Sequence, residues 1–281
     1  MRVAIASGKG GTGKTTVATC LSVLLSRAGQ DVAYLDCDVE EPNGHIFLKP
    51  TIRSRETIYL PVPVVDQDKC TLCRKCEKIC QYNAILCIGN KTLVFQELCH
   101  ACGGCYLVCP ANAITEVDRE IGVVEEGFAG EVRFAHGKLK IGEALSPPLV
   151  KGVKRRALSN GITVLDAPPG TSCPVVETIM HADLVVLVTE PTPFGLNDLK
   201  LAVDMTRQVG AEFGVIINRS DIGDDKTKKF CQQHRIELLG EIPDDRDVAV
   251  AYSHGELPID AVSGYSDYLR PLVEKVLGGE R

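Results

Sequence analysis

The chain has 281 residues, of which 44% are hydrophobic and 24% are charged, and its formal net charge at pH 7 is -6. This length is enough for one large hydrophobic core, or for one core and a small additional module. The negative net charge provides no general attraction to nucleic acid or to anionic lipid, so neither is expected as a partner.

The first predicted strand leads directly into a glycine-rich loop. Residues 3–6 are an apolar run, and they do not have the pattern of a secretory signal peptide. The sequence GKGGTGKT follows at 8–15 and matches the P-loop pattern G-x-x-x-x-G-K-[ST]. A helix is predicted next, over 15–28, so the loop lies between a strand and a helix as a nucleotide-binding P-loop requires.

The residues of this loop are suited to binding the phosphates of ATP. Gly10, Gly11 and Gly13 allow backbone N–H groups to converge on phosphate oxygens. Lys14 supplies positive charge at the β- and γ-phosphates, and the Thr15 hydroxyl can ligate Mg²⁺. The loop therefore predicts an ATP site with a magnesium ion.

Acidic residues follow two of the predicted strands. Asp36 and Asp38 come after the strand at 32–35, and Asp166 ends the strand at 162–165. An aspartate at a strand end is often only a turn former or a helix cap. Three of them at the ends of strands near a P-loop favour a second role, which is to hold Mg²⁺ and to orient a water molecule for attack on the γ-phosphate.

The stretch from 60 to 118 has sparse apolar residues and periodic cysteines, so it is predicted to be an inserted domain. Residues 1–59 and 119–281 would then form one discontinuous ATPase domain. The sequence holds 13 cysteines and no export signal, which favours metal ligation in a reducing cytoplasm over a disulfide framework.

Eight of the cysteines form two copies of the pattern C-x₂-C-x₂-C-x₃-C, 29 residues apart. Bacterial ferredoxins have this spacing, and in them the fourth cysteine of each run ligates the other cluster. The pattern predicts one [4Fe-4S] cluster on Cys70, Cys73, Cys76 and Cys109, and a second on Cys80, Cys99, Cys102 and Cys105. Zinc is the alternative, but three evenly spaced cysteines and a fourth, all duplicated, suit a cubane better than a tetrahedral ion.

Beyond the insert the chain alternates between strands and helices. The predicted elements are strands at 162–165, 184–188 and 213–217, and helices at 145–159, 196–209 and 225–234. This alternation predicts an α/β fold with a mostly parallel sheet covered on both faces, and with ligands bound beyond the carboxyl ends of the strands. The apolar run at 184–188 is too short to cross a bilayer.

Three segments together resemble the deviant Walker A ATPases, which include MinD, ParA, the Mrp-type iron-sulfur carriers and the nitrogenase iron protein. They are KGGTGKTT with its additional Lys9, DCDVEEPN after the second strand, and DAPPG after Asp166. The similarity covers residues 1–58 and 120–281. With the cysteine repeats, the whole chain resembles the MinD-superfamily ATPases that carry an inserted ferredoxin domain.

The resemblance implies a role for further residues. Lys9 would reach across a nucleotide-sandwiched dimer to the partner's phosphates, and Asp38 would position the attacking water. Thr15, Asp38 and Asp166 would surround the magnesium ion. The resemblance also adds Gly8, Thr12 and Thr16 to the phosphate loop, and Asn218, Arg219, Pro243 and Asp244 on the adenine side, although these last four also suit ordinary helix caps.

The remaining cysteines are less informative. Cys20, Cys87 and Cys231 are predicted to act as small hydrophobic residues, and Cys37 to point away from the face used by its neighbouring aspartates. Cys173 lies seven residues after Asp166, where the nitrogenase iron protein has a cluster ligand, so it is either a ligand between subunits or a plain thiol at a helix start.

Three functions remain open. The first is a cytoplasmic Mg-dependent ATPase, slow without a partner, in which ATP-dependent dimerisation controls electron transfer through two clusters. The second is an iron-sulfur assembly or carrier ATPase, and the third is a MinD/ParA-like positioning ATPase with structural or sensory clusters. The expected partners are a second identical or similar ATPase chain and a redox or iron-sulfur recipient protein.

Overall fold

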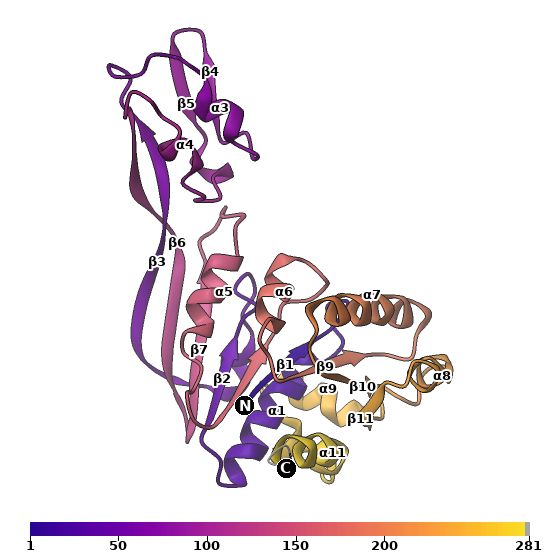
Figure 1. The fold of residues 1–281 in the computed structure, drawn as a ribbon. Helices are drawn as coiled ribbons and strands as arrows, with labels where there is room; N and C mark the ends of the chain where they lie inside the picture. The colour runs from indigo at the N-terminus through magenta and orange to yellow at the C-terminus, as the bar shows by residue number, and fades with distance from the viewer. Residues whose placement is uncertain (279–281) are drawn as a thin grey trace.

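A nine-stranded sheet forms the body of the protein in a computed structural model that describes residues 1–278 (Figure 1). The strands lie in the order β11-β10-β9-β1-β8-β2-β7-β6-β3, and all pairs from β11 to β7 are parallel. The parallel strands are β1 (Arg2–Ala6), β2 (Val32–Asp36), β7 (Val132–Leu139), β8 (Ile162–Asp166), β9 (Leu184–Thr189), β10 (Phe213–Asn218) and β11 (Glu237–Ile242).

The predicted mostly parallel α/β sheet is confirmed, and each of the five strands predicted for it lies within one residue of its expected bounds. Strands β7 and β11 were not predicted. β7 contains Arg133, His136 and Lys138, and β11 contains two glutamates, so neither has the continuous apolar run by which buried parallel strands are recognised.

Helices cover both faces of the sheet. One face is covered by α5 (Pro147–Lys154), α6 (Cys173–Ile179), α7 (Pro193–Val209) and α8 (Lys226–Gln233). The other face is covered by α1 (Lys14–Arg27), α9 (Arg246–Ser253), α10 (Pro258–Ala261) and α11 (Tyr265–Leu277), and the short α2 (Gly44–Leu48) lies beside α1. None of the helices described within residues 1–278 is long and apolar enough to cross a membrane.

Two predicted helices have different bounds in the structure. The helix expected over 145–159 is only Pro147–Lys154. It begins at Pro147 because its two prolines fit the first turn but not a helix interior. The helix expected from residue 196 begins at Pro193, since the Thr192 hydroxyl caps it by accepting a hydrogen bond from Gly195 N.

A long antiparallel ribbon extends from the edge of the sheet and carries a separate lobe at its far end (Figure 1). The ribbon consists of β3 (Thr51–Val65) and β6 (Ile114–Ala129). Residues 66–113, here named the distal lobe, contain α3 (Lys75–Ile79), β4 (Ile85–Ile88), β5 (Lys91–Val94), the 3₁₀ helix η1 (Gln96–Leu98) and α4 (Gly104–Leu107).

The predicted domain boundaries, at 59/60 and 118/119, fall inside β3 and β6. Both strands run unbroken from the body to the distal lobe, and their register shifts between Ile58 and Tyr59. At this shift, two residues of β3 face the three residues Glu120 to Gly122 of β6, so β6 has one extra residue. Such a bulge increases the local twist of the ribbon.

Candidate functional site

The phosphate loop connects the end of β1 to the first turn of α1. Gly11 and Gly13 have φ angles of 77° and 94°, a left-handed conformation that strains any residue with a side chain. A Cβ atom at Gly13 would also lie 2.5 Å from Asn218 Nδ2. The loop therefore requires glycine at both positions, and it directs the amino end of α1 towards the pocket beyond the strands.

This pocket has an empty volume of about 1320 Å³ and contains most of the residues predicted to bind ATP. Of those predicted residues, Gly10, Gly11, Gly13, Lys14, Thr15, Thr16, Asp38, Asn218, Arg219, Pro243 and Asp244 line it. Tyr252 and Tyr265 also line it and were not predicted, because an aromatic residue in a C-terminal helix carries no signal of its own. Gly8, Lys9, Thr12 and Asp166 are not among the lining residues.

Two of the residues predicted to bind ATP, Asn218 and Gly8, have a structural function in this chain. Asn218 donates from Nδ2 to the Thr12 carbonyl oxygen at 2.9 Å, so the end of β10 holds the phosphate loop in place. Gly8 packs against α7, where an added Cβ would lie 2.2 Å from the Asp198 carbonyl oxygen. The first glycine of the motif is thus required by helix packing.

The three aspartates lie close together because β2 and β8 are neighbours, with Asp36 paired to Asp166. Asp36 is buried and accepts hydrogen bonds from Gly44 N at 2.9 Å and Asp38 N at 3.1 Å. Asp36 therefore stabilises the conformation of the loop after β2 and does not line the pocket. Asp38 does line the pocket.

Asp166 is buried beneath the phosphate loop. Its Oδ2 accepts a hydrogen bond from the Tyr34 hydroxyl at 2.9 Å, and its Oδ1 has no hydrogen-bond partner among residues 1–278. Burial raises the pKa of Asp166, while the Lys14 charge and the Thr15 hydroxyl act in the opposite direction. An unpartnered buried carboxylate oxygen beside Thr15 fits a divalent cation, which would satisfy it.

The Asp38 carboxyl lines this pocket and has a raised pKa. Burial, followed by the charge of Asp166, raises its pKa from 3.8 to about 6. A raised carboxyl pKa favours the protonated form in the folded state, so ionised Asp38 destabilises the apo protein above pH 6, and this penalty is lost as the pH falls towards 3.8.

We expect Asp38→Asn to stabilise the nucleotide-free protein by about 1–3 kcal/mol at pH 8, with a smaller gain at pH 5. Urea unfolding in EDTA at both pH values measures this difference. Saturating Mg²⁺ and nucleotide should reduce the gain, because the cation stabilises the ionised wild-type carboxylate. An equal gain at pH 8 and pH 5 would show that the effect does not arise from ionisation.

Lys9 is held within its own chain. Its Nζ lies 3.0 Å from Glu190 Oε2, and the other oxygen of Glu190 lies 3.1 Å from Arg219 Nη1. Arg219 also pairs with Asp244 at 3.4 Å. The buried Glu190, which was not predicted, thus links Lys9 to the residues expected on the adenine side, and only the tertiary fold brings these positions together.

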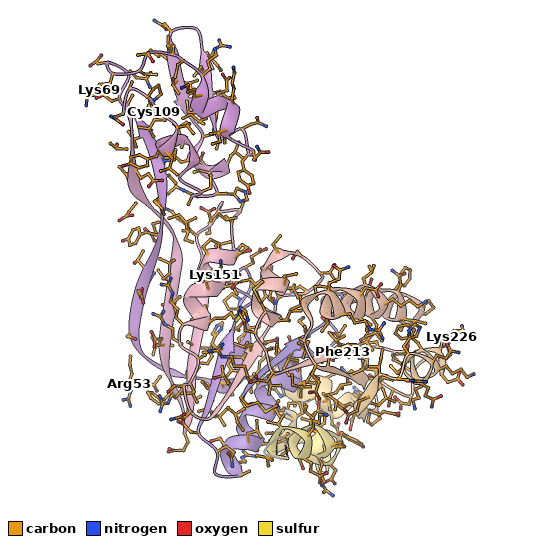
Figure 2. All side chains as sticks on the ribbon, in the orientation of Figure 1. Arg53, Lys69, Cys109, Lys151, Phe213 and Lys226 are labelled. Carbon is orange, nitrogen blue, oxygen red and sulfur yellow. The ribbon has the colours of Figure 1, made fainter. Side chains whose placement is uncertain are left out.

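The distal lobe contains two cavities, each lined by four of the eight repeated cysteines. The first has an empty volume of about 330 Å³ and is lined by Cys70, Cys73, Cys76 and Cys109. The second has an empty volume of about 420 Å³ and is lined by Cys80, Cys99, Cys102 and Cys105. Each cavity therefore takes its fourth cysteine from the other repeat, and Cys109 is labelled in the lobe in Figure 2.

The other cysteines occupy different surroundings. Cys20, Cys37 and Cys231 are buried in the two cores of the body. Cys173 is exposed at the start of α6 and lines neither cavity of the lobe. Cys87 is buried as expected of a small hydrophobic residue, but it also lines the first cavity, where it is a fifth thiol that spacing alone does not indicate.

No three His, Cys, Asp or Glu side chains of residues 1–278 are grouped as they would be around a single metal ion. A [4Fe-4S] cluster does not need such a group, because its four cysteines bind four different irons.

A glycine loop between a buried strand and a helix, carboxylates at the ends of the neighbouring strands and a pocket beyond a parallel sheet together define a P-loop nucleotide-binding protein. Residues 3–259 match the family described as the CobQ/CobB/MinD/ParA nucleotide binding domain. The chain belongs to this family of P-loop ATPases.

The chain is similar to several proteins along nearly its whole length. It is 32% identical to the uncharacterized protein MJ0578 of Methanocaldococcus jannaschii, over 98% of this chain and 96% of the relative. It is 27% identical to an iron-sulfur cluster carrier protein of Aquifex aeolicus, over 90% of this chain and 60% of the relative. The septum site-determining protein MinD of Pyrococcus horikoshii, solved with Mg-ADP, has the same fold, with a TM-score of 0.60, 19% identity, and coverage of 99% of this chain and 97% of that one.

Proposed function

We propose that this protein is a magnesium-dependent ATPase of the deviant Walker A type that controls electron transfer through two [4Fe-4S] clusters. The inserted domain, residues 60–118, which consists of the distal lobe and the adjoining part of the ribbon, is ferredoxin-like in this proposal. ATP-dependent dimerisation of two chains would determine when the clusters exchange electrons with a partner protein. The observation that carries the proposal is a chain of contacts between the pocket loop after β2 and the ribbon that holds the two cysteine cavities.

The residues of the lobe fit iron-sulfur clusters. Besides the four thiols of each cavity, backbone N–H groups point at cysteine sulfurs: Ala113 N lies 3.3 Å from Cys109 Sγ, and Ala84 N lies 3.3 Å from Cys80 Sγ. Such hydrogen bonds stabilise the negative charge of a cysteine-ligated cluster. When bound, each cluster would supply a one-electron redox centre.

The ATPase chemistry is assigned to the pocket at the amino end of α1. Lys14 and the loop N–H groups would bind the phosphates, Thr15, Asp38 and Asp166 would hold Mg²⁺, and Asp38 would orient the attacking water. Support comes from the pocket lining, from the unpartnered Asp166 oxygen, and from the Mg-ADP bound to the structurally similar MinD. Lys9 would leave Glu190 to reach the phosphates of a partner chain.

The pocket loop contacts the base of the ribbon through residues 139–146, here named the connecting segment. Leu139 N donates to the Val39 carbonyl oxygen at 2.8 Å, and Ser146 Oγ donates to Glu40 Oε1 at 3.1 Å. Val39 and Glu40 directly follow Asp38, so any rearrangement of Asp38 around magnesium and the γ-phosphate acts on this segment.

The connecting segment in turn contacts β6. Lys140 N donates to the Ile121 carbonyl oxygen at 2.9 Å, and Glu143 forms an ion pair with Arg119, with both side chains largely buried. Arg119 lies two residues from Ile121, beside the register shift of the ribbon. These contacts provide a physical route by which nucleotide state would alter the orientation or solvent exposure of the lobe, and exposure is one determinant of cluster potential.

The test is a redox titration of the clusters in the nucleotide-free, ADP and non-hydrolysable ATP states. We expect nucleotide to shift a cluster potential by about 60 mV, and by reciprocity the reduced and oxidised protein should differ in ATP affinity by about tenfold. Identical potentials in all three states, with an ATP affinity that ignores redox state, would contradict the proposal.

Arg119→Met tests the route itself. It should retain both clusters and ATP binding but lose most of the nucleotide-dependent shift, because the ion pair with Glu143 is removed. Arg270→Met is the matched control, since Arg270 pairs with Asp267 on the exposed side of α11. A full shift in Arg119→Met would exclude this ion pair as the route.

Cluster donation is the second candidate, supported by the similarity to proteins named iron-sulfur cluster carriers and by the exposure of Cys73 and Cys102. Rapid loss of clusters to an apo-protein, with no effect of nucleotide on potential, would favour it. A positioning function like that of MinD has less support, because the apolar residues of α11 (Tyr265, Leu269, Leu272 and Val276) are buried against the core and leave no apolar helix face of that kind for a membrane.

A further inference from the structure

The internal repeat makes the two cysteine cavities directly comparable. The same offset of 29 residues that relates Cys70 to Cys99 also relates Ala113 to Ala84 and Ile114 to Ile85, and all of these residues line the cavities. The lining residues related by this offset differ at five positions: Thr71/His100, Arg74/Gly103, Ala111/Tyr82, Cys87/Glu116 and Thr92/Pro63. In the last two of these pairs, the first cavity has Cys87 and Thr92 where the second has Glu116 and Pro63.

Thr92 is placed to interact with a sulfur of the first cavity. It is 2% exposed, and its Oγ1 lies 3.3 Å from Cys70 Sγ and 3.3 Å from Cys87 Sγ. Gln67 holds the Thr92 backbone with two hydrogen bonds, at 2.8 Å to its carbonyl oxygen and 3.1 Å from its N–H. The hydroxyl therefore has a fixed position between two thiols.

The direction of these hydrogen bonds follows from the chemistry of a cluster ligand. Cys70 bound to iron is a thiolate with no proton, so it can only accept, and the single hydroxyl proton of Thr92 is donated to it. The Thr92 oxygen then accepts the proton of the Cys87 thiol. The result is a chain of donors from Cys87 through Thr92 to Cys70.

In the part of the chain that the structure describes, the hydrogen bonds to ligand sulfurs of the second cavity come from backbone N–H groups, of Ala84 to Cys80 and of Ala101 to Cys99, and not from a hydroxyl or thiol side chain. Pro63 has no side-chain donor, and Glu116 has a carboxylate, which is negatively charged at neutral pH. Hydrogen bonds to the sulfurs favour the reduced cluster, whose negative charge is greater, and a nearby carboxylate disfavours it.

We propose that Thr92 and Cys87 make the cluster of the first cavity the centre with the higher reduction potential. A single electron taken up by the lobe would then reduce that cluster. This inference rests on the proposed function, because it requires both clusters. With both clusters bound, one electron would pass from the cluster held by Cys80, Cys99, Cys102 and Cys105 to the cluster held by Cys70, Cys73, Cys76 and Cys109, so that one cluster loses an electron and the other gains it, with no bond made or broken.

The ribbon gives this transfer a direction in space. The second cavity is lined by the pair Pro63 and Glu116, and the first by the pair Val65 and Ile114, which is two residues further along the ribbon from the body. The electron would therefore move to the cavity that lies farther along the ribbon from the ATPase body.

The test is a dithionite titration of anaerobic protein, followed by electron paramagnetic resonance, in the wild type and three variants. The wild type should show two one-electron steps. Thr92→Val keeps the shape of the side chain but removes the donor. The reduction potential of the higher step should therefore fall by about 59 mV, which is a tenfold change in the redox equilibrium of that step. Thr92→Ser keeps the hydroxyl and should leave both steps unchanged.

Glu116→Gln tests the second cavity and should raise the reduction potential of the lower step only. The change should be less than tenfold in the redox equilibrium, because the Glu116 side chain is exposed and solvent screens its charge. Both Thr92→Val and Glu116→Gln should thus narrow the gap between the steps. An unchanged gap in Thr92→Val, or a fall in its lower step instead, would overturn the inference. Iron and sulfide content separates the two hypotheses: full content with an unchanged gap contradicts only the role of Thr92, whereas wild-type protein without iron contradicts the proposed function.

Discussion

Protein isolated without oxygen is expected to contain about eight irons and eight sulfides per chain, because two sets of four cysteines would each hold one [4Fe-4S] cluster. Chemical iron and sulfide analysis measures this directly. Stoichiometric zinc, with no iron taken up on anaerobic reconstitution, would contradict the cluster assignment and favour zinc sites.

Cys76→Ser should remove about half of the iron. Cys76 lines the first cavity and is buried in the small core of the lobe, so its loss should impair the first cluster and spare most of the second. Cys173→Ser is the control, since Cys173 is exposed on the body and lines neither cavity. Loss of iron in Cys173→Ser would revive the alternative that this cysteine is a cluster ligand.

Lys14→Ala is expected to weaken ATP binding by roughly 10- to 150-fold, which corresponds to about 1.5–3 kcal/mol for a hydrogen-bonded charge. The Lys14 side chain lines the pocket and is 7% exposed, so solvent screens its interaction with phosphate only weakly. Isothermal titration calorimetry with a non-hydrolysable ATP analogue measures the change. The effect should be absent for a nucleoside without phosphates.

Lys9→Ala should behave differently, because the Lys9 ammonium contacts Glu190 of its own chain and does not line the pocket. ATP binding should remain largely intact, while ATP-dependent dimerisation and hydrolysis fall. Sedimentation velocity with and without the ATP analogue separates the two effects. Normal dimerisation and hydrolysis by Lys9→Ala would exclude a role for this lysine at a partner's phosphates.

Glu190→Gln complements this test. Removing the charge of Glu190 weakens the contact that holds Lys9 within the chain, so dimerisation should need less ATP analogue than in the wild type. A requirement for more analogue would show that Glu190 supports the dimer instead, through its second contact with Arg219.

The sequence alone predicted the parts of the protein that depend on short stretches of chain. The phosphate loop, the strand before it and the helix after it follow from spacing and from glycine, because backbone conformation there is decided by residues that are neighbours in sequence. The five recognised strands share this property, since each is a continuous apolar run. The length of the helix at Pro147 was less predictable, because a polar, amphipathic continuation resembles a helix whether or not it packs on the sheet.

The relations between distant segments were decided only by the tertiary structure. Asp36 and Asp38 look alike in sequence, and two residues apart on an extended strand they would share a face. In the structure β2 ends at Asp36, whose carboxylate accepts from Gly44 N, whereas Asp38 lies in the loop beyond the strand and lines the pocket. Glu190 meets Lys9 because β9 is paired with β1.

The two cysteine repeats show the same division. Their spacing indicated which cysteines could hold clusters, since three ligands of each cluster lie within a few residues of one another. It did not reveal that Thr92 and Cys87 stand beside one cavity and Pro63 and Glu116 beside the other. Those neighbours come from a hairpin and from the ribbon, and hydrogen bonds and charges act through space, so the difference between the two cavities exists only once the chain has folded.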